Sequence, residues 1–264
     1  MSSHMDNSLE DFKIDILEDG VIDLDEVAKI KERLYADDVI DRDEADFLFA
    51  LNDETSGKEN DPGWQALFVE ALSDHVLKDE ESPGVIDDNE ADYLIEKIKG
   101  DGVVDANELK LLVNICATAT GESPVGFNQF ILDSVKAAVI EDGIVDSDEV
   151  EMMKMVIYGA GGAGGAGVDR AEADMLFDIN DATTDKEGHD PSWQAFFVDA
   201  IAKHVLEDET SPGEIDEEEG DWLISKIEGD GEYDANEKAL LSHIKAKANS
   251  ITGTLKFKID MFGS

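Results

Sequence analysis

The sequence predicts an all-α protein made of two tandem copies of one helical unit, with a first domain at 8–123 and a second at 124–264. A long string supports the duplication, because DPGWQALFVEALSDHV at 61–76 returns as DPSWQAFFVDAIAKHV at 190–205. Apolar residues within this string recur at the spacing of one helix face. A short acidic element is also repeated throughout the chain. Self-similarity of this kind is typical of a duplicated structural unit.

The short element predicts where each helix ends and the next begins. It consists of a turn, an apolar residue and Asp-x-x-Glu, as in EDGVIDLDE at 18–26 and GDGVVDANE at 100–108. A glycine in the left-handed conformation closes one helix. The Asp then caps the next helix, and the Glu completes a capping box. We call each such turn a joint. The joints divide the first copy into six predicted helices, at 8–18, 24–35, 42–51, 62–78, 88–99 and 106–120.

Two segments depart from this pattern. The second copy carries a glycine-rich insertion, GAGGAGGAG at 159–167, between its second and third predicted helices. It lacks the Lys and the following Ser or Thr of a phosphate-binding loop. We expect it to be a flexible excursion, because glycine-rich chain behaves as a coil. The C-terminal string LKFKIDMF at 255–262 alternates, so it fits either a short strand or the start of a helix.

The charge of the chain limits its function. Sixty-five acidic residues against 21 basic ones give a formal net charge of −44. Such a chain does not bind nucleic acid directly, because it has no basic track for the phosphates. It is equally unsuited to an anionic membrane surface. A surface of this sign attracts metal ions and basic partner proteins.

The remaining composition predicts a cytoplasmic protein without a membrane span. Hydrophobic residues make up 42% of the chain, which is enough for a packed core. The single cysteine, Cys116, excludes an internal disulfide framework and suits a reducing compartment. No apolar run reaches the length of a membrane helix. The opening MSSHM resembles a cloning scar and is not followed by the apolar region of a signal peptide.

Comparison with the EF-hand loop tests for ordinary calcium sites. An EF-hand needs oxygen ligands at positions 1, 3, 5, 9 and 12 around a glycine at position 6. With Gly20 at position 6, the third ligand is replaced by Leu17. With Gly84 there, Asp79 is first and Glu90 twelfth, but Pro83 removes the fifth ligand. With Gly102 there, two lysines take ligand positions. We therefore expect weak or shared divalent sites, with calcium as the ion, rather than EF-hands.

The placement of certain acids suggests where such sites lie. In the first and fourth joints of each copy an Asp directly precedes the closing glycine, where the helix dipole disfavours negative charge. If the helices run up and down, these two joints meet at one pole together with the loop at 52–61. The first predicted metal site consists of Asp19, Asp23, Glu26, Asp53, Asp101, Asp105 and Glu108. Its twin consists of Asp142, Asp146, Glu149, Asp181, Asp230, Asp234 and Glu237. Helix capping alone is the alternative interpretation of these Asp-x-x-Glu pairs.

The other conspicuous residues are expected to be structural. His75 and His204 lie on the apolar stripe of the longest repeated string, which predicts hydrogen-bonded histidines at the edge of the core. The three tryptophans are expected in the core: Trp64, Trp193 and Trp222. No Ser-His-Asp or Cys-His grouping has suitable spacing, and acidic pairs are too common to single out a general acid and base. The sequence therefore predicts a protein that is not an enzyme.

The joints EDGVIDLDE, EDGIVDSDE and GDGVVDANE resemble those of the TerB-like family of tellurite-resistance proteins, whose helices are closed by A-D-G-x-V-x-x-x-E turns. The resemblance implies a compact helical fold for each copy and a cytoplasmic role in the metal stress response. It also implies divalent metal binding and association with tellurite-resistance-type partner proteins. This chain departs from the family in its internal duplication, its extreme acidity and its joints that open with Pro-Gly.

The leading functional hypothesis is a non-enzymatic acidic helical protein that binds divalent cations, protein partners or both. A plain calcium buffer is a second hypothesis. The third is a nucleic-acid mimic that inhibits a basic DNA-binding protein. Mimicry favours rows of carboxylates at phosphate spacing, whereas the acids here follow the joints, which counts against it.

Overall fold

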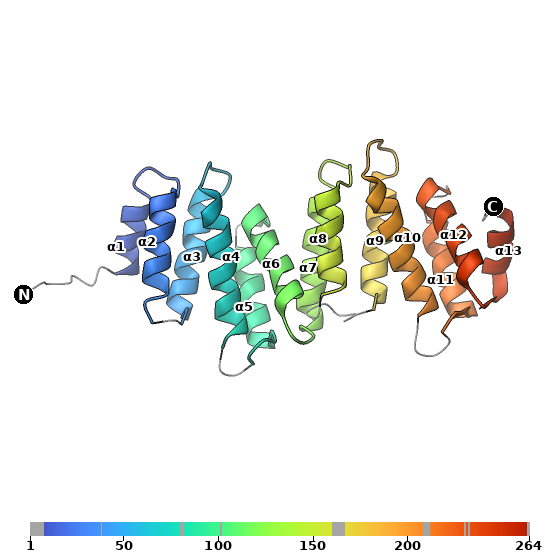
Figure 1. Ribbon diagram of the computed structural model, residues 1–264, viewed down its shortest axis with the longest axis horizontal. Coiled ribbons are helices and arrows are strands. Elements are labelled where there is room, and N and C mark those ends of the chain that lie inside the picture. The colour runs from blue at the N-terminus through green and yellow to red at the C-terminus, as the bar shows by residue number, and fades with distance from the viewer. Residues whose placement is uncertain are drawn as a thin grey trace, which may run out of the picture. The chain divides into compact units, whose positions relative to one another are not determined.

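The computed structural model describes residues 8–37, 39–79, 82–100, 102–159, 167–207, 212–229, 231 and 233–262. Within these residues the chain forms thirteen α-helices and two strands of two residues each (Figure 1). The predicted all-α class is therefore confirmed. No helix in this described part is both long and apolar enough to cross a membrane. The predicted insertion at 159–167 lies largely outside the described residues.

The chain divides into two compact units, Met1–Phe127 and Asn128–Ser264. In the first unit every predicted helix is present, and α3 runs four residues past its predicted end because Asn52 and Thr55 in its last turn are buried. Figure 1 shows the α1–α2 and α3–α4 loops at one end of this unit and the α2–α3 and α4–α5 loops at the other. The helices are α1 (Leu9–Ile16), α2 (Leu24–Leu34), α3 (Arg42–Thr55), α4 (Pro62–Leu77), α5 (Asp88–Ile98) and α6 (Ala106–Thr118).

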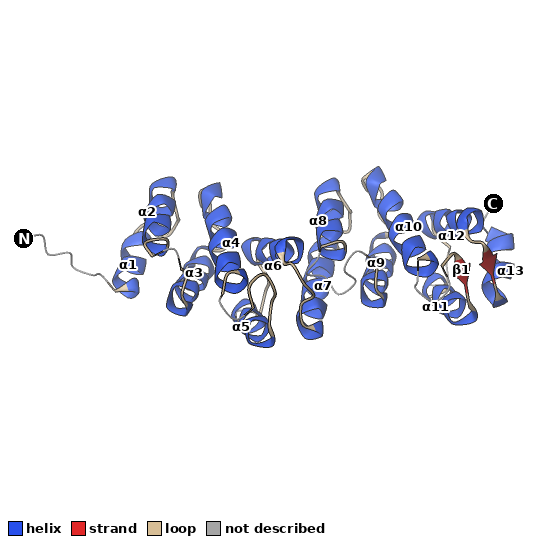
Figure 2. Cartoon of the chain, turned by 60° about the horizontal axis from the view of Figure 1, so that its bottom comes forward, coloured by secondary structure: helices blue, strands red, loops and turns tan. Residues whose placement is uncertain are grey.

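The second unit follows the same order of helices. Its first helix, α7, begins within the last residues of the first unit. The helices are α7 (Val125–Val139), α8 (Ser147–Ile157), α9 (Arg170–Thr183), α10 (Pro191–Leu206), α11 (Glu217–Ile227), α12 (Ala235–Lys247) and α13 (Gly253–Phe262). The ambiguous string at 255–262 is thus a helix. The strands β1 (Glu214–Ile215) and β2 (Ser250–Ile251) pair in parallel, beside α11 and α13 (Figure 2).

Capping boxes begin most of the helices, as the joint motif predicts. At α2 the Asp23 carboxylate accepts from the Glu26 N–H at 2.9 Å, and Glu26 returns the bond by accepting from the Asp23 N–H at 3.0 Å. Each reciprocal pair satisfies two backbone donors that the helix itself leaves without partners. The other caps of this kind are Asp41, Asp87, Asp105, Asp146, Asp169, Asp216 and Asp234.

The closing glycines of the joints adopt the left-handed conformation that the motif requires. Gly20 has φ 80° and Gly143 has φ 76°. Gly84 and Gly213 are the most constrained, because a Cβ would lie 2.5 Å from the Thr120 hydroxyl at Gly84 and 2.4 Å from the Asn249 amide nitrogen at Gly213. The Thr120 N–H donates to the Gly84 carbonyl at 2.7 Å and so ties the start of α5 to the end of α6. Glycine at position 84 is therefore required both by its backbone conformation and by the close packing around it.

The longest repeated string forms the central helix of each unit. Trp64 in α4 and Trp193 in α10 are each 1% exposed, which confirms their predicted place in the core. α4 packs against α2, α3 and α6, and α10 packs against α8, α9 and α12. Trp222, by contrast, is only half-buried, and its indole N–H donates to Asp174 at 3.0 Å. The apolar stripe of one helix therefore organises each unit.

Both predicted core-edge histidines are hydrogen-bonded. The Nδ1 atom of His75 lies 2.8 Å from the Ile40 carbonyl, and that of His204 lies 2.8 Å from the Val168 carbonyl. Because a carbonyl only accepts, Nδ1 carries the proton in both rings. Burial is the main reason that the pKa of His204 is lowered. These contacts confirm a structural role for the pair.

Candidate functional site

Two hydrogen bonds join the first joint to the loop after α3, and a third ties that loop to the end of α3. The Asn60 side chain accepts from the Ile22 N–H at 2.9 Å and donates to the Thr55 carbonyl at 2.9 Å. The Asp61 N–H donates to the Ile22 carbonyl at 2.8 Å. The α1–α2 joint is thereby held against the C-terminal end of α3.

The fourth joint reaches the same end of α3. The Asp105 carboxylate caps α6 through Oδ1, while its Oδ2 accepts from the Asn52 amide at 2.7 Å and the Ser56 hydroxyl at 2.8 Å. Asn52 is 1% exposed. The two joints of the predicted metal site thus contact one region, as the up-and-down topology predicts.

A chain of amides continues inward from Asp105. The Asn107 amide donates to the Asn52 carbonyl oxygen at 2.7 Å, and the Gln65 amide donates to Asn107 at 2.9 Å. Sequence reasoning missed Asn52 and Asn107. The duplication could have identified them, because asparagine recurs at the equivalent positions of the second copy, Asn180 and Asn236.

The second unit contains the matching chain. The Asn180 amide donates to Asp234 Oδ2 at 2.5 Å, and the Thr184 hydroxyl donates to the same atom at 3.0 Å. Asn236 donates to Asn180 at 2.8 Å, and Gln194 donates to Asn236 at 2.9 Å. The same polar linkage therefore joins three helices in each unit.

The predicted metal ligands are mainly engaged with the backbone. Asp19 accepts from the Val21 N–H at 3.1 Å, and Asp142 accepts from the Ile144 N–H at 2.8 Å. The partners Glu108 and Glu237 of two capping boxes are 2% and 1% exposed. The other predicted ligands that act as helix caps or cap partners are Asp23, Glu26, Asp105, Asp146, Glu149 and Asp234.

The other four predicted ligands complete this set. Asp53 lies exposed on α3, and Asp181 lies half-buried on α9. Asp101 and Asp230 lie outside the described residues. Among the residues that the structure describes, no three His, Cys, Asp or Glu side chains converge closely enough to hold a metal ion. The two seven-residue sites accordingly stay predictions.

Three acids of the second predicted site nevertheless lie close enough for their charges to interact. The pKa of Glu149 is raised, first by burial and then by the negative charges of Asp146 and Asp142. A similar group lies at the second joint, where burial, Asp41 and Asp37 raise the pKa of Glu44. In both groups an added positive charge would relieve the repulsion.

The strongest such group lies at the α4–α5 joint, outside the predicted sites. Burial, followed by the charges of Asp79 and Asp87, raises the pKa of Glu90 to about 7. Ser82 links Asp79 to Glu90, because its N–H donates to Asp79 at 3.1 Å and its hydroxyl lies 3.4 Å from a Glu90 carboxylate oxygen. Asp79 and Glu90 are the first and twelfth positions of the loop that Pro83 excludes from the EF-hand pattern. We call Asp79, Asp87 and Glu90 the Glu90 cluster.

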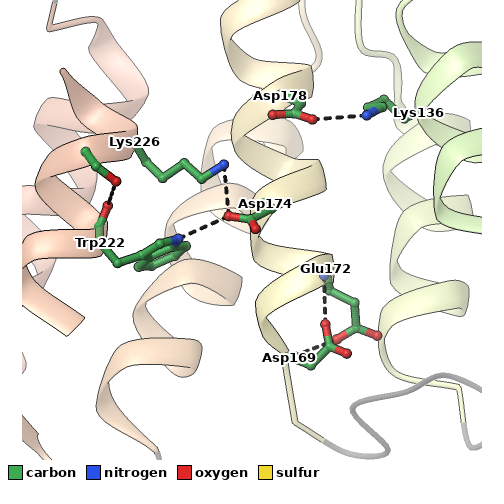
Figure 3. A network of polar contacts seen from close by, with 8 residues as sticks. Lys136, Asp169, Glu172, Asp174, Asp178, Trp222 and Lys226 are labelled. Atoms are coloured by element: carbon green, nitrogen blue, oxygen red, sulfur yellow. Dashed lines mark hydrogen bonds and ion pairs between the residues drawn. The ribbon is translucent and has the colours of Figure 1, made fainter. Parts of the chain in front are cut away.

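Several lysines are taken up by ion pairs between helices. In Figure 3, Asp178 of α9 pairs with Lys136 of α7 at 3.0 Å, and Asp174 pairs with Lys226 of α11 at 2.9 Å. The same view shows the capping pair Asp169 and Glu172. Such pairs use the scarce basic residues to join helices. The excess of carboxylates is therefore not neutralised within the chain.

No family model, curated protein or solved structure matches the chain. The TerB-like resemblance of the joints thus stays a prediction from their motif. The features of the chain that point to a function are its net negative charge, its joints and the Glu90 cluster.

Proposed function

We propose that the chain is a non-enzymatic acidic protein that binds cations at its helix joints. Its small ligands would be divalent metal ions, calcium first, and its larger ligands would be basic segments of partner proteins. The feature that supports this most directly is the grouping of Asp79 and Glu90 around Ser82 beside the cap Asp87, where burial and the neighbouring charges raise the pKa of Glu90 to about 7. A carboxyl group that holds its proton near neutral pH lies in a field that favours added positive charge.

A divalent ion brings more positive charge to this cluster than a proton does. Calcium takes carboxylate, hydroxyl and carbonyl oxygens in flexible geometry, and it tolerates water in several ligand positions. Asp79 and Glu90 are linked through Ser82 and supply such oxygens. Two carboxylates with water as the remaining ligands would give weak binding, as expected for a cation-responsive surface protein.

Basic protein segments are the larger ligands that the charge favours. The net charge of −44 increases the rate at which cationic partners associate, and salt screens this attraction. The TerB-like joints suggest tellurite-resistance-type partners and a role in metal stress. We further propose that the units are two copies of one TerB-like fold, because their Asn-Asp linkages and core-edge histidines match.

Proton release provides the test. At pH 7 part of the Glu90 population is protonated, so calcium binding at the Glu90 cluster should expel protons. Calorimetric titration in two buffers of different ionisation enthalpy measures this release. We expect calcium binding with proton release in the parent, and we expect Glu90→Gln to abolish the release.

Asp92→Asn is the matched control, because it removes an exposed acid from the same helix outside the predicted metal sites. It should leave proton release unchanged. The proposal fails if calcium, magnesium and terbium all give no binding heat. It also fails for the Glu90 cluster if Glu90→Gln releases as many protons as the parent.

A further inference from the structure

Three of the seven methionines lie within four residues of helix α8. Met153 is fully buried and occupies the place that Ile30 has in the first unit, so it belongs to the core. Met155 is instead 36% exposed, and Met152 is half-buried. Residues three apart on a helix are neighbours on its surface. The thioether groups of Met152 and Met155 therefore lie side by side at the edge of the solvent, and we call these two residues the methionine pair.

The first unit shows that this part of the surface does not need methionine. The residues equivalent to the methionine pair are Lys29 and Glu32 of α2, and both are exposed. Charged side chains are the usual residues at such positions, because they keep their contact with water. Two thioethers thus stand in the second unit where the first unit has two charged groups. Packing of the core explains Met153 but not the methionine pair.

A carboxylate lies on the same face of α8. Asp148 precedes Met152 by one helical turn and Met155 by two, which is the i, i+4, i+7 spacing of a single helix face. Asp148 is exposed. The one base of this helix, Lys154, pairs with Glu151 at 2.7 Å. The face therefore combines two sulfur atoms with a negative charge.

The neighbouring helix α10 contacts a different side of α8. The Lys154 amine lies 5.8 Å from the centre of the Phe196 ring, and Tyr158 packs edge-on against that ring. The Lys203 amine of α10 lies over the Tyr158 ring. Lys154 follows Met152 by two residues, so it points to the opposite side of the helix. The two nearby lysines are thus engaged away from Met152.

The chemistry of thioethers determines which ligand such a pair suits. Their sulfur is a soft ligand that selects copper(I), whereas calcium and magnesium take hard oxygen ligands. Methionine has three rotatable bonds, so two neighbouring side chains can turn both sulfurs toward one ion. The net charge of −44 raises the concentration of cations around the molecule.

We propose that Met152 and Met155 form a surface site for a soft monovalent metal ion of the copper(I) class. The two sulfurs bind the ion, and Asp148 supplies negative charge beside it. Two ligands from adjacent turns of one helix make a weak and readily exchanging site. The proposal is independent of cation binding at the joints, because it uses sulfur rather than carboxylate oxygen.

Nuclear magnetic resonance of protein labelled with methyl-13C methionine tests this proposal. Silver(I), added as silver nitrate in chloride-free buffer, is the probe, because it is as soft as copper(I) and stable in air. Ligation of a sulfur changes the resonance of the methyl group attached to it. We expect the methyl resonances of Met152 and Met155 to shift together along one binding curve. Calcium at the same concentrations should shift neither.

Two controls separate the pair from other soft ligands. Met261 is 55% exposed but has no second methionine within a helical turn, so its resonance should stay in place while the pair titrates. Cys116→Ala removes the one thiol of the chain, which also has affinity for silver. The shifts of the pair should persist in this variant.

Removal of one sulfur tests whether the two act together. Met152→Leu and Met155→Leu each keep the side-chain volume nearly constant. In either variant the silver concentration that shifts the remaining methionine should rise about tenfold or more, because even the loss of a supporting group costs a metal site that much. Circular dichroism checks that each variant is helical.

Three results would overturn the proposal. If neither methyl group of the pair shifts on addition of silver, there is no site. If Met155 titrates alike in the parent and in Met152→Leu, the two sulfurs do not share an ion. If Met261 shifts over the same concentrations as the pair, silver binds any exposed thioether and α8 holds no specific site.

Discussion

Asn60 and His189 make the same two hydrogen bonds at equivalent joints. Asn60 accepts from the Ile22 N–H and donates to the Thr55 carbonyl. His189 Nδ1 accepts from the Val145 N–H at 3.0 Å, and Nε2 lies 3.1 Å from the Thr183 carbonyl. The ring must therefore be neutral, with its proton on Nε2, because only then does Nδ1 accept.

Removing the ring should weaken the second of these joints. His189→Ala leaves the Val145 N–H and the Thr183 carbonyl without this side-chain partner, whereas His189→Asn supplies the amide that makes both bonds in the first unit. We expect His189→Ala to lose about 1 kcal/mol of stability, the value of one hydrogen bond, and His189→Asn to lose less. Urea unfolding measures both losses.

The reverse change provides the control. Asn60→Ala should cost a similar amount in the first unit, and Asn60→His should cost less than Asn60→Ala. Equal losses for His189→Ala and His189→Asn would contradict the equivalence of the two side chains.

Glu90→Gln should make the stability of the protein less sensitive to pH. Because the pKa of Glu90 is raised from 4.5 to about 7, its contribution to stability is present below pH 4.5 and is lost as pH rises through 7. Glutamine keeps a capping oxygen and never ionises. We expect the variant to lose less stability than the parent between pH 5 and pH 8, measured by urea unfolding. Asp92→Asn, an exposed change on the same helix, should follow the parent; if Glu90→Gln does so too, the expectation is wrong.

The buried amide chain should contribute strongly to stability. Asn52→Ala removes the partners of Asp105 and Asn107 in a site that water does not reach readily. We expect a loss of about 2 kcal/mol, because buried polar groups left without partners keep their desolvation cost. Asn180→Ala should act alike in the second unit. Asn89→Ala, at an exposed position, should cost less than about 0.5 kcal/mol; similar losses for Asn52 and Asn89 would contradict this account.

Calcium distinguishes capping from ligation at the first joints. Asp23→Ala should cost about 1 kcal/mol without metal, because it removes a cap. Asp19→Asn and Asp142→Asn keep the oxygen that the turn needs, and each should gain a few tenths of a kcal/mol by removing charge from a helix C-terminus. If these acids bind calcium, the stabilisation by calcium should be smaller in both Asn variants. Melting curves matched for ionic strength measure it, and equal calcium shifts in all proteins would leave capping alone.

The helix positions could be predicted because they are encoded locally. Asp23 and Glu26 specify the start of α2 within four residues, and Gly20 closes the preceding turn. Such signals need no tertiary information. The end of α3 was less accurate, because burial of Thr55 against other helices extends it beyond any local stop signal.

The candidate site was harder to predict for a physical reason. Sequence showed which acids lie near a joint but not which lie near one another across it. The contact of Asn52 with Asp105 and the effect of Asp79 on Glu90 both depend on packing between helices. Asp79 and Glu90 do occupy the first and twelfth positions of an EF-hand pattern, but Pro83 interrupts that pattern at its fifth ligand.

The bond between Asn52 and Asp105 spans 53 residues of sequence. This bond forms only after α3 and α6 have docked, so it closes a large loop late in folding. Its stabilisation is therefore gained only when the whole unit is folded. The capping boxes, by contrast, can form while the rest of the chain is still unfolded. Native-state hydrogen exchange should therefore show the amides of α3 and α6 opening together in one cooperative step, and never one helix without the other.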